Sequence, residues 1–176
     1  MAKPSTQPLA PRCELRAAGF TLFELMVTVS VGAILLVVGV PTFTSFVQNN
    51  RAATHANELV TSFALARNEA IRRGVAIEIC SSADGATCSG GNDWTIGWIV
   101  RTGGGQVLRA WPQRSGGAGL LSADVSTVQY QPRGSATAAV LPTRFRVRPP
   151  QCTGDQGRDI RLNAAGRTVV TREACI

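Results

Sequence analysis

The sequence is poor in charged residues and has almost no lysine or histidine. Only 16% of its 176 residues are charged, well below the usual quarter, and Lys3 is the only lysine. A phosphate-binding loop of the GxxxxGK type is excluded, because no other lysine exists to complete it. The single histidine, His55, excludes chemistry that needs two imidazoles. We expect His55 to lie on a solvated surface with no chemical role.

Enzymatic hydrolysis lacks its usual groups as well. Ser81 and Ser82 lie near Asp84, but no suitable histidine base is available to activate a serine. The acidic residues are few and scattered, so no pair of carboxylates can be proposed for acid–base work. The sequence therefore predicts a protein that is not an enzyme and needs no cofactor.

The amino-terminal part combines a short basic leader with one long apolar run. Residues 1–19 contain Lys3, Arg12 and Arg16 and have no periodic apolar face, whereas residues 20–40 contain a single charge, that of Glu24. Twenty-one helical residues span roughly 31 Å, about the thickness of one bilayer core. We expect residues 20–40 to cross a membrane once, with the leader in the cytoplasm and the rest of the chain outside.

The order of these parts differs from that of an ordinary secretory signal. In such a signal the cleavage site follows the apolar region, so the apolar region is discarded. Here the small residue Gly19 precedes the apolar run. A cut after Gly19 would leave the apolar helix on the mature protein.

Residues 19–24, GFTLFE, resemble the class III signal of type IV pilins and type II secretion pseudopilins. The resemblance implies that a prepilin peptidase cleaves between Gly19 and Phe20 and methylates the new amino group of Phe20. It also implies that Glu24 and Pro41 occupy positions where this family keeps a glutamate and often a proline. The expected partners are the peptidase, the inner membrane and other pilins or pseudopilins in a filament.

Physical chemistry independently singles out Glu24. A carboxylate in an apolar helix costs a few kcal/mol unless it is paired, so it is a functional candidate. In the family, this glutamate is thought to meet the amino terminus of a neighbouring subunit during assembly; the alternative is a carboxylate that only reaches the lipid headgroups. Pro41 is expected to end or kink the helix. Gly32 and Gly39 would either loosen this section or allow close helix packing.

The rest of the chain predicts one α+β domain. Residues 42–73 place apolar side chains at helical spacing, and Gly74 is a suitable stop. Strand-like runs separated by glycine-rich turns then follow. They cover residues 75–82, 94–100, 106–111, 126–131, 144–148, 158–163 and 167–173. A long helix packed on an antiparallel β-sheet is the roll architecture of type IV pilins.

Several segments resemble the GspH/FimT group of minor pilins and pseudopilins. They are ELVTSFALARNEAIRRG, IEICSS followed by Asp84, Gly85 and Cys88, DWTIGWIV, and IRLNAAGR. The resemblance implies a leader at 1–19, an assembly helix at 20–40 and a periplasmic domain at 41–176. It fits a minor pilin of a type IV pilus or, alternatively, a GspH-type pseudopilin of a type II secretion system.

Four of the five cysteines remain after cleavage of the leader, which contains Cys13. An even number in an exported domain favours disulfides. Proximity along the chain suggests that Cys80 pairs with Cys88 and Cys152 with Cys175; loop closure would make these bridges worth about 2.6 and 3.4 kcal/mol at most. The spacings contain no close CxxC pair, so a metal site is not expected.

The carboxyl-terminal quarter concentrates the positive charge. Arg144, Arg146 and Arg148 alternate with apolar residues, so in a strand their side chains share one face at about 7 Å spacing. Such a stripe could hold phosphates of DNA in a salt-sensitive manner, or be the solvent face of an edge strand.

Some FimT-like minor pilins bind DNA through a carboxyl-terminal Gly-Arg-x-Arg motif. This chain departs from that motif at its second arginine, because Val169 follows Gly166, Arg167 and Thr168. Arg158, Arg161 and Arg167 are the main candidate contacts for DNA, supported by the stripe of three arginines.

Overall fold

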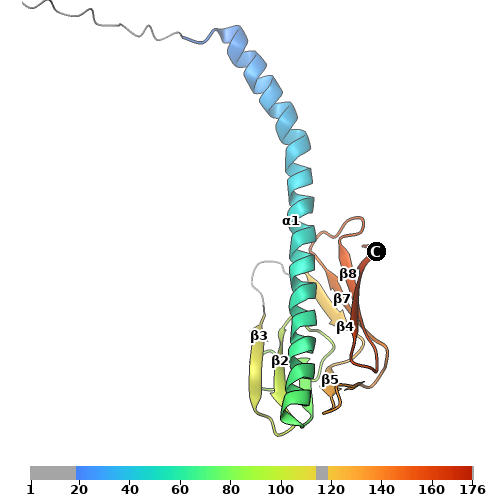
Figure 1. The fold of residues 1–176 in the computed structure, drawn as a ribbon. Helices are drawn as coiled ribbons and strands as arrows, with labels where there is room; N and C mark the ends of the chain where they lie inside the picture. The colour runs from blue at the N-terminus through green and yellow to red at the C-terminus, as the bar shows by residue number, and fades with distance from the viewer. Residues whose placement is uncertain (1–18, 114–118, 176) are drawn as a thin grey trace, which may run out of the picture. The chain divides into compact units, whose positions relative to one another are not determined.

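The computed structural model describes residues 19–113 and 119–175, of which Leu120 is placed by its backbone alone (Figure 1). The chain divides into two compact units, residues 1–40 and residues 41–176. Among the described residues, one helix, α1 (Leu22–Arg73), runs through both units, and nine strands follow it in the second.

In the first unit, α1 begins immediately after Thr21, which acts as the N-cap residue. The Thr21 hydroxyl oxygen accepts a hydrogen bond of 3.2 Å from the backbone N–H of Glu24, and the N–H of Leu25 donates to the Thr21 carbonyl. The helix continues through Pro41, so an end of the helix at that residue is wrong. By length and composition alone, α1 could cross a membrane.

In the second unit, the strands form two antiparallel sheets. The five-stranded sheet has the order β3 (Val107–Pro112), β2 (Gly97–Thr102), β1 (Ile77–Ser81), β5 (Thr127–Tyr130) and β6 (Ala136–Thr137). The four-stranded sheet has the order β4 (Leu120–Ala123), β7 (Thr143–Arg148), β8 (Gly157–Leu162) and β9 (Thr168–Glu173). The α+β fold and all seven expected strands are confirmed, whereas β4 and β6 were not predicted.

The core lies between the second half of α1 and the two sheets. The buried helix residues recur at helical spacing: Ala52, Ala56, Leu59, Phe63, Ala66 and Ala70. Phe63 meets Phe145 of β7 and Trp94, which precedes β2, and the Phe145 and Trp94 rings pack edge to face with centroids 5.0 Å apart. Every residue of the core cluster lies between Ala52 and Leu162. The second unit therefore carries its own core, and a fragment beginning at residue 49 keeps all of it.

The expectation that His55 is solvated is wrong. His55 is only 9% exposed, and its Nδ1 lies 3.9 Å from a carboxylate oxygen of Glu58 on the next turn. The reason is helical periodicity: His55 lies four residues before Leu59 and three after Ala52, on the buried side of α1. It lines a small cavity together with Trp94 and Trp98.

Two disulfides close loops in the second unit, Cys80–Cys88 and Cys152–Cys175. These are the pairs suggested by proximity along the chain. The second bridge joins the segment before β8 to the residues after β9, and the N–H of Cys175 also donates to the carbonyl of Gly154. The bridge therefore holds the end of the chain against the four-stranded sheet.

Candidate processing segment and arginine surface

The predicted cleavage site lies outside the helix. Gly19 and Phe20 have no regular secondary structure and are exposed, and Thr21 caps the helix that follows. Thr21 and Glu24 form the S/T-x-x-E pattern of a capping box, a signal at helix starts that our sequence interpretation missed. Glu24 thus stands in the first turn of α1, where the helix dipole favours a negative charge.

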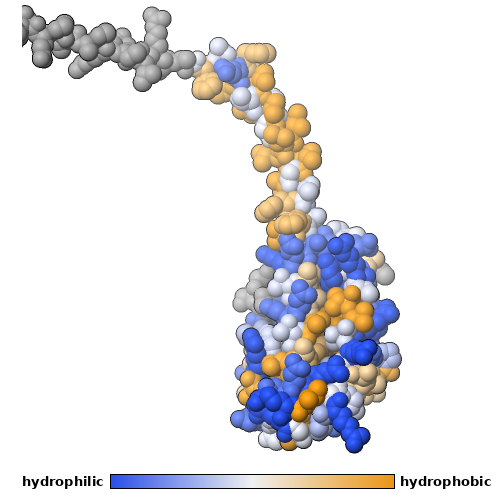
Figure 2. Space-filling view, viewed as in Figure 1, coloured by the Kyte–Doolittle hydropathy of each residue, from blue (hydrophilic) through white to orange (hydrophobic). Residues whose placement is uncertain are grey.

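The apolar residues of the first unit are not packed against any other described part of the chain. Large apolar residues are exposed on all sides of the helix, and Figure 2 shows this stretch mostly in the hydrophobic colour, with one blue patch near its start and pale areas between. They include Leu22, Phe23, Leu25, Met26, Val29, Val31, Ile34, Leu35, Leu36, Val37 and Val38. A helix that is apolar all round needs lipid or other helices around it.

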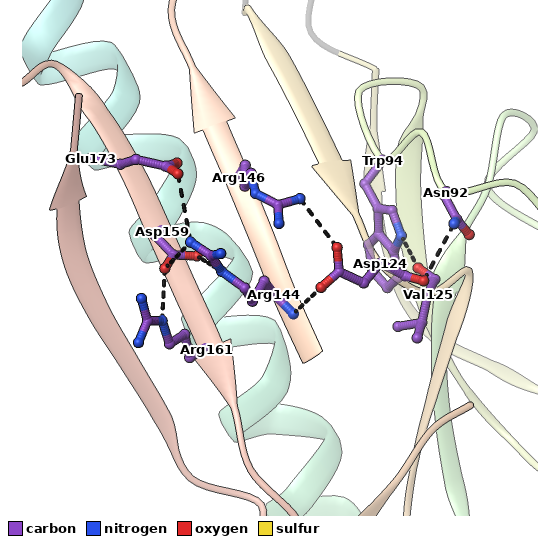
Figure 3. A network of polar contacts seen from close by, with 9 residues as sticks. All are labelled: Asn92, Trp94, Asp124, Val125, Arg144, Arg146, Asp159, Arg161 and Glu173. Carbon is purple, nitrogen blue, oxygen red and sulfur yellow. Dashed lines mark hydrogen bonds and ion pairs between the residues drawn. The ribbon is translucent and has the colours of Figure 1, made fainter. Parts of the chain in front are cut away.

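A buried carboxylate organises the arginines of the four-stranded sheet (Figure 3). Arg144 binds Asp159 through two hydrogen bonds of 3.2 and 2.9 Å, and Arg161 donates from Nε to the same carboxylate at 2.8 Å. Arg144 also lies 3.6 Å from Glu173. The Asp159 side chain is only 2% exposed. Burial alone would raise the pKa of Asp159, but the hydrogen bonds from Arg144 and Arg161 outweigh it and lower the pKa.

Arg146 has a carboxylate partner of its own. Its Nη1 donates to Asp124 at 3.1 Å, and the other oxygen of that carboxylate accepts from the backbone N–H of Arg144. The stripe of Arg144, Arg146 and Arg148 does share one face, because Phe145 and Val147 between them are buried. The charges of Arg144 and Arg146 are nevertheless compensated by carboxylates within the chain, and Arg148 is half-buried. The stripe is therefore not a continuous track of uncompensated cations.

Arg158 has a structural position, which corrects its assignment as a contact for DNA. It is 7% exposed, and Nη1 donates to the carbonyls of Asp155, Gln156 and Gly157. Its Nη2 donates at 2.6 Å to the side chain of Asn49 on α1. Arg158 and Arg161 are three residues apart in a strand, so they point to opposite faces of β8, and only Arg161 points outward.

Arg161 and Arg167 remain accessible. The Arg161 side chain is 57% exposed although it binds Asp159. Arg167 is exposed and lies in the turn between β8 and β9, immediately before β9. Its backbone N–H donates to the Asn163 side chain. The Arg167 guanidinium has no carboxylate within ion-pair distance among residues 19–113 and 119–175.

An exposed amino-terminal apolar helix that continues into a domain of antiparallel sheets defines a pilin-type subunit. The family model described as Type II transport protein GspH matches residues 55–166, and the model of the prokaryotic N-terminal methylation motif matches residues 15–40. The chain therefore belongs to the GspH family. This family and this fold are those of structural pilins rather than enzymes.

Two solved structures share the fold. Both are of the Pseudomonas aeruginosa type IV minor pilin FimU, crystallised in space groups P65 and P21. The first is 21% identical, with a TM-score of 0.51, and the match covers 70% of this chain and 99% of the other. The second is 22% identical, with a TM-score of 0.54, covering 74% and 99%. No curated protein matches the chain.

Proposed function

We propose that this chain is a minor pilin of a type IV filament, made as a precursor and processed by a prepilin peptidase. The leader 1–19 is removed, the amino group of Phe20 is methylated, and residues 20–40 anchor the subunit in the inner membrane. Residues 41–176 lie in the periplasm, and Glu24 aligns the helix with its neighbours during assembly. The match of residues 15–40 to the methylation motif, on a helix that is apolar on all sides, is the observation that carries this proposal.

A second candidate is a pseudopilin of a type II secretion system, favoured by the description of the matching family. The fold shared with FimU favours a pilus instead. Deletion of the gene separates the two functions. Loss of surface pili with normal secretion supports the pilus, and retention of secreted proteins in the periplasm supports the pseudopilus.

Processing should depend on Gly19. We expect Gly19→Leu to block cleavage completely, because a large side chain then replaces the small residue at the scissile bond, so the unshortened precursor accumulates in the membrane. Gly32→Leu is the matched control within the apolar helix and should be cleaved normally. Mass spectrometry of the membrane-extracted chain measures both. Complete cleavage of the Gly19→Leu chain would overturn the proposed processing.

For DNA, the geometry leaves Arg161 and Arg167 as the accessible contacts of the six candidate arginines. We propose that a fragment of residues 49–176 binds DNA in the micromolar range and more weakly as salt rises. Replacing both arginines by alanine should weaken binding about tenfold or more at low salt. The control is Arg51→Ala with Arg109→Ala, which removes the same charge from exposed positions elsewhere.

Fluorescence anisotropy at low and physiological salt measures this binding. An equal loss in the two double variants would mean that only net charge matters. If the unmodified fragment does not bind DNA at low salt, the arginines only face solvent and have no role in DNA capture.

A further inference from the structure

Strand β9 presents an open edge. In the described part of the chain, β9 pairs with β8 alone. The N–H of Asn163 donates to the Arg167 carbonyl. In an antiparallel pair, hydrogen-bonded and non-hydrogen-bonded residue pairs alternate. The backbone N–H and C=O groups of Thr168, Val170 and Arg172 therefore point away from β8. The edge is also apolar, since Val169 is 55% exposed and Val170 40% exposed.

Both long edge strands carry an arginine, but β3 also has a bulge and a proline that discourage pairing, and β9 has neither. The β2–β3 register shifts at Val100 and Arg101, β3 ends in Pro112, and Arg109 is exposed in its middle over the ring of Trp111. A bulge, a proline and a charge are the usual protections of an edge. Strand β9 has a regular register over all six residues, and its first four residues, 168–171, are all valine or threonine. This contrast points to an edge that is kept free for a partner strand.

Uncompensated positive charge lies at one end of this edge. Arg172 is directly opposite Arg158 in the β8–β9 register, an unfavourable pair of like charges. The buried Arg158 has its pKa lowered by burial and by Arg172. Arg172 itself has no carboxylate within ion-pair distance among the described residues, although Asp155 is nearby.

A recess of about 370 Å³ adjoins Arg172. Besides Arg172 it is lined by Thr42, Ser45, Phe46, Asn49, Asp155 and Gln156. The recess gives room for an incoming carboxylate beside the Arg172 guanidinium, and such a group would relieve the repulsion between Arg172 and Arg158.

A second copy of this chain fits the edge poorly. Strand β9 runs antiparallel to the part of α1 within residues 41–73. The strand starts near Gly134 and Arg67, late in the helix, and ends near Asn49, which comes earlier in the helix. An antiparallel β9–β9 pair would therefore set the parts of the two α1 helices within residues 41–73 antiparallel, whereas the head-to-tail contacts of a filament keep all subunits in one direction. A parallel pair in register would place Arg172 beside Arg172 of the other copy.

We propose that β9 is the docking edge for an extended, carboxylate-bearing segment of a different pilin-type subunit in the same filament. The segment adds a fifth strand to the β4–β7–β8–β9 sheet, bonding to the backbone of Thr168, Val170 and Arg172. Its carboxylate binds Arg172 in the recess. This inference rests on the proposed function as a filament subunit.

The test uses the full chain in the bacterium that makes it, with a photo-crosslinking p-benzoylphenylalanine in place of Val169. The control carries the same group in place of Ala110, on the protected edge β3. After illumination, adducts are digested and mapped by mass spectrometry. We expect the Val169 position to give adducts within an extended acidic segment of another pilin-type subunit, and the Ala110 position to give none there.

Charge reversal sharpens the test. Arg172→Glu should lower the adduct yield at Val169 about tenfold, and Arg109→Glu should leave it unchanged. Exchanging the partner's carboxylate for arginine should restore the yield with Arg172→Glu.

Adducts to a second copy or to nucleic acid would overturn the proposal. The absence of adducts while the processed chain is found in filaments would overturn it but leave the proposed function intact. Absence of the processed chain from every filament would overturn both.

Discussion

Replacing Asp159 by alanine is expected to destabilise the folded unit by about 3 kcal/mol. Removing one partner of a buried ion pair costs roughly 3–5 kcal/mol, and here the exposed Arg161 can regain water, which keeps the loss at the lower end. Denaturant unfolding of a fragment of residues 49–176 measures the effect. The control is Asp155→Ala, an exposed aspartate in the same quarter of the chain, which should change stability by about 0.5 kcal/mol or less. Equal effects of the two replacements would contradict a structural role for the Asp159 network.

The same network predicts a dependence of stability on pH. The folded-state pKa of Asp159 is lowered, so the unfolded chain takes up its proton first as the pH falls. The stabilisation is therefore complete above the ordinary aspartate pKa of about 4 and is lost as the pH drops towards the folded-state value. The pKa of Asp84 is lowered too, by hydrogen bonds from Thr87 and Ala86. The measurement is therefore the difference in free energy of unfolding between the unmodified fragment and the Asp159→Asn fragment. This difference should shrink below pH 4.

Replacing Glu24 by alanine is expected to leave cleavage intact and to abolish incorporation into filaments. The predicted scissile bond precedes Thr21, outside the helix, so cleavage should not need Glu24. The carboxylate that we propose to pair with a neighbouring amino terminus is absent from the variant. The charged amino terminus of the neighbour would then lie unpaired in an apolar bundle at a cost of about a few kcal/mol, so incorporation should fall more than tenfold. Immunoblots of sheared filaments and of membranes measure incorporation and processing separately.

Glu24→Gln distinguishes the role of the Glu24 charge from its role in capping the helix. Glutamine also serves in a capping box, so this variant keeps the helix start while removing the charge. Failure of Glu24→Gln to assemble would assign the role to the carboxylate. Normal assembly of either variant would contradict the proposed pairing.

Patterns within a single segment were enough to predict the elements of this fold. The helical spacing of Leu59, Phe63, Ala66 and Ala70 and the alternation in residues 144–148 fixed both the type of element and the buried face. The disulfides followed from proximity along the chain. Strands β4 and β6 were missed because they are short, and their apolar residues show little alternation. His55 was misplaced because its polar neighbours in sequence were weighed above its position on the helix.

The arginine surface could be predicted only in part, because its partners come from distant segments. Asp159 lies fifteen residues from Arg144, and Asp124 lies twenty-two residues from Arg146, so both contacts depend on strand register. The burial of Arg158 depends on Asn49, 109 residues away on α1. Charge counts along the chain cannot show which arginines already have a carboxylate.

The proposed processing is tested most directly by the identity of the mature amino terminus. The full chain is extracted from the membrane of the bacterium that makes it, digested, and its first peptide is sequenced by mass spectrometry. Processing by a prepilin peptidase predicts a peptide that begins at Phe20 with one methyl group on its amino nitrogen and no trace of residues 1–19. A chain that retains its leader, or is cut after the apolar helix, would contradict it.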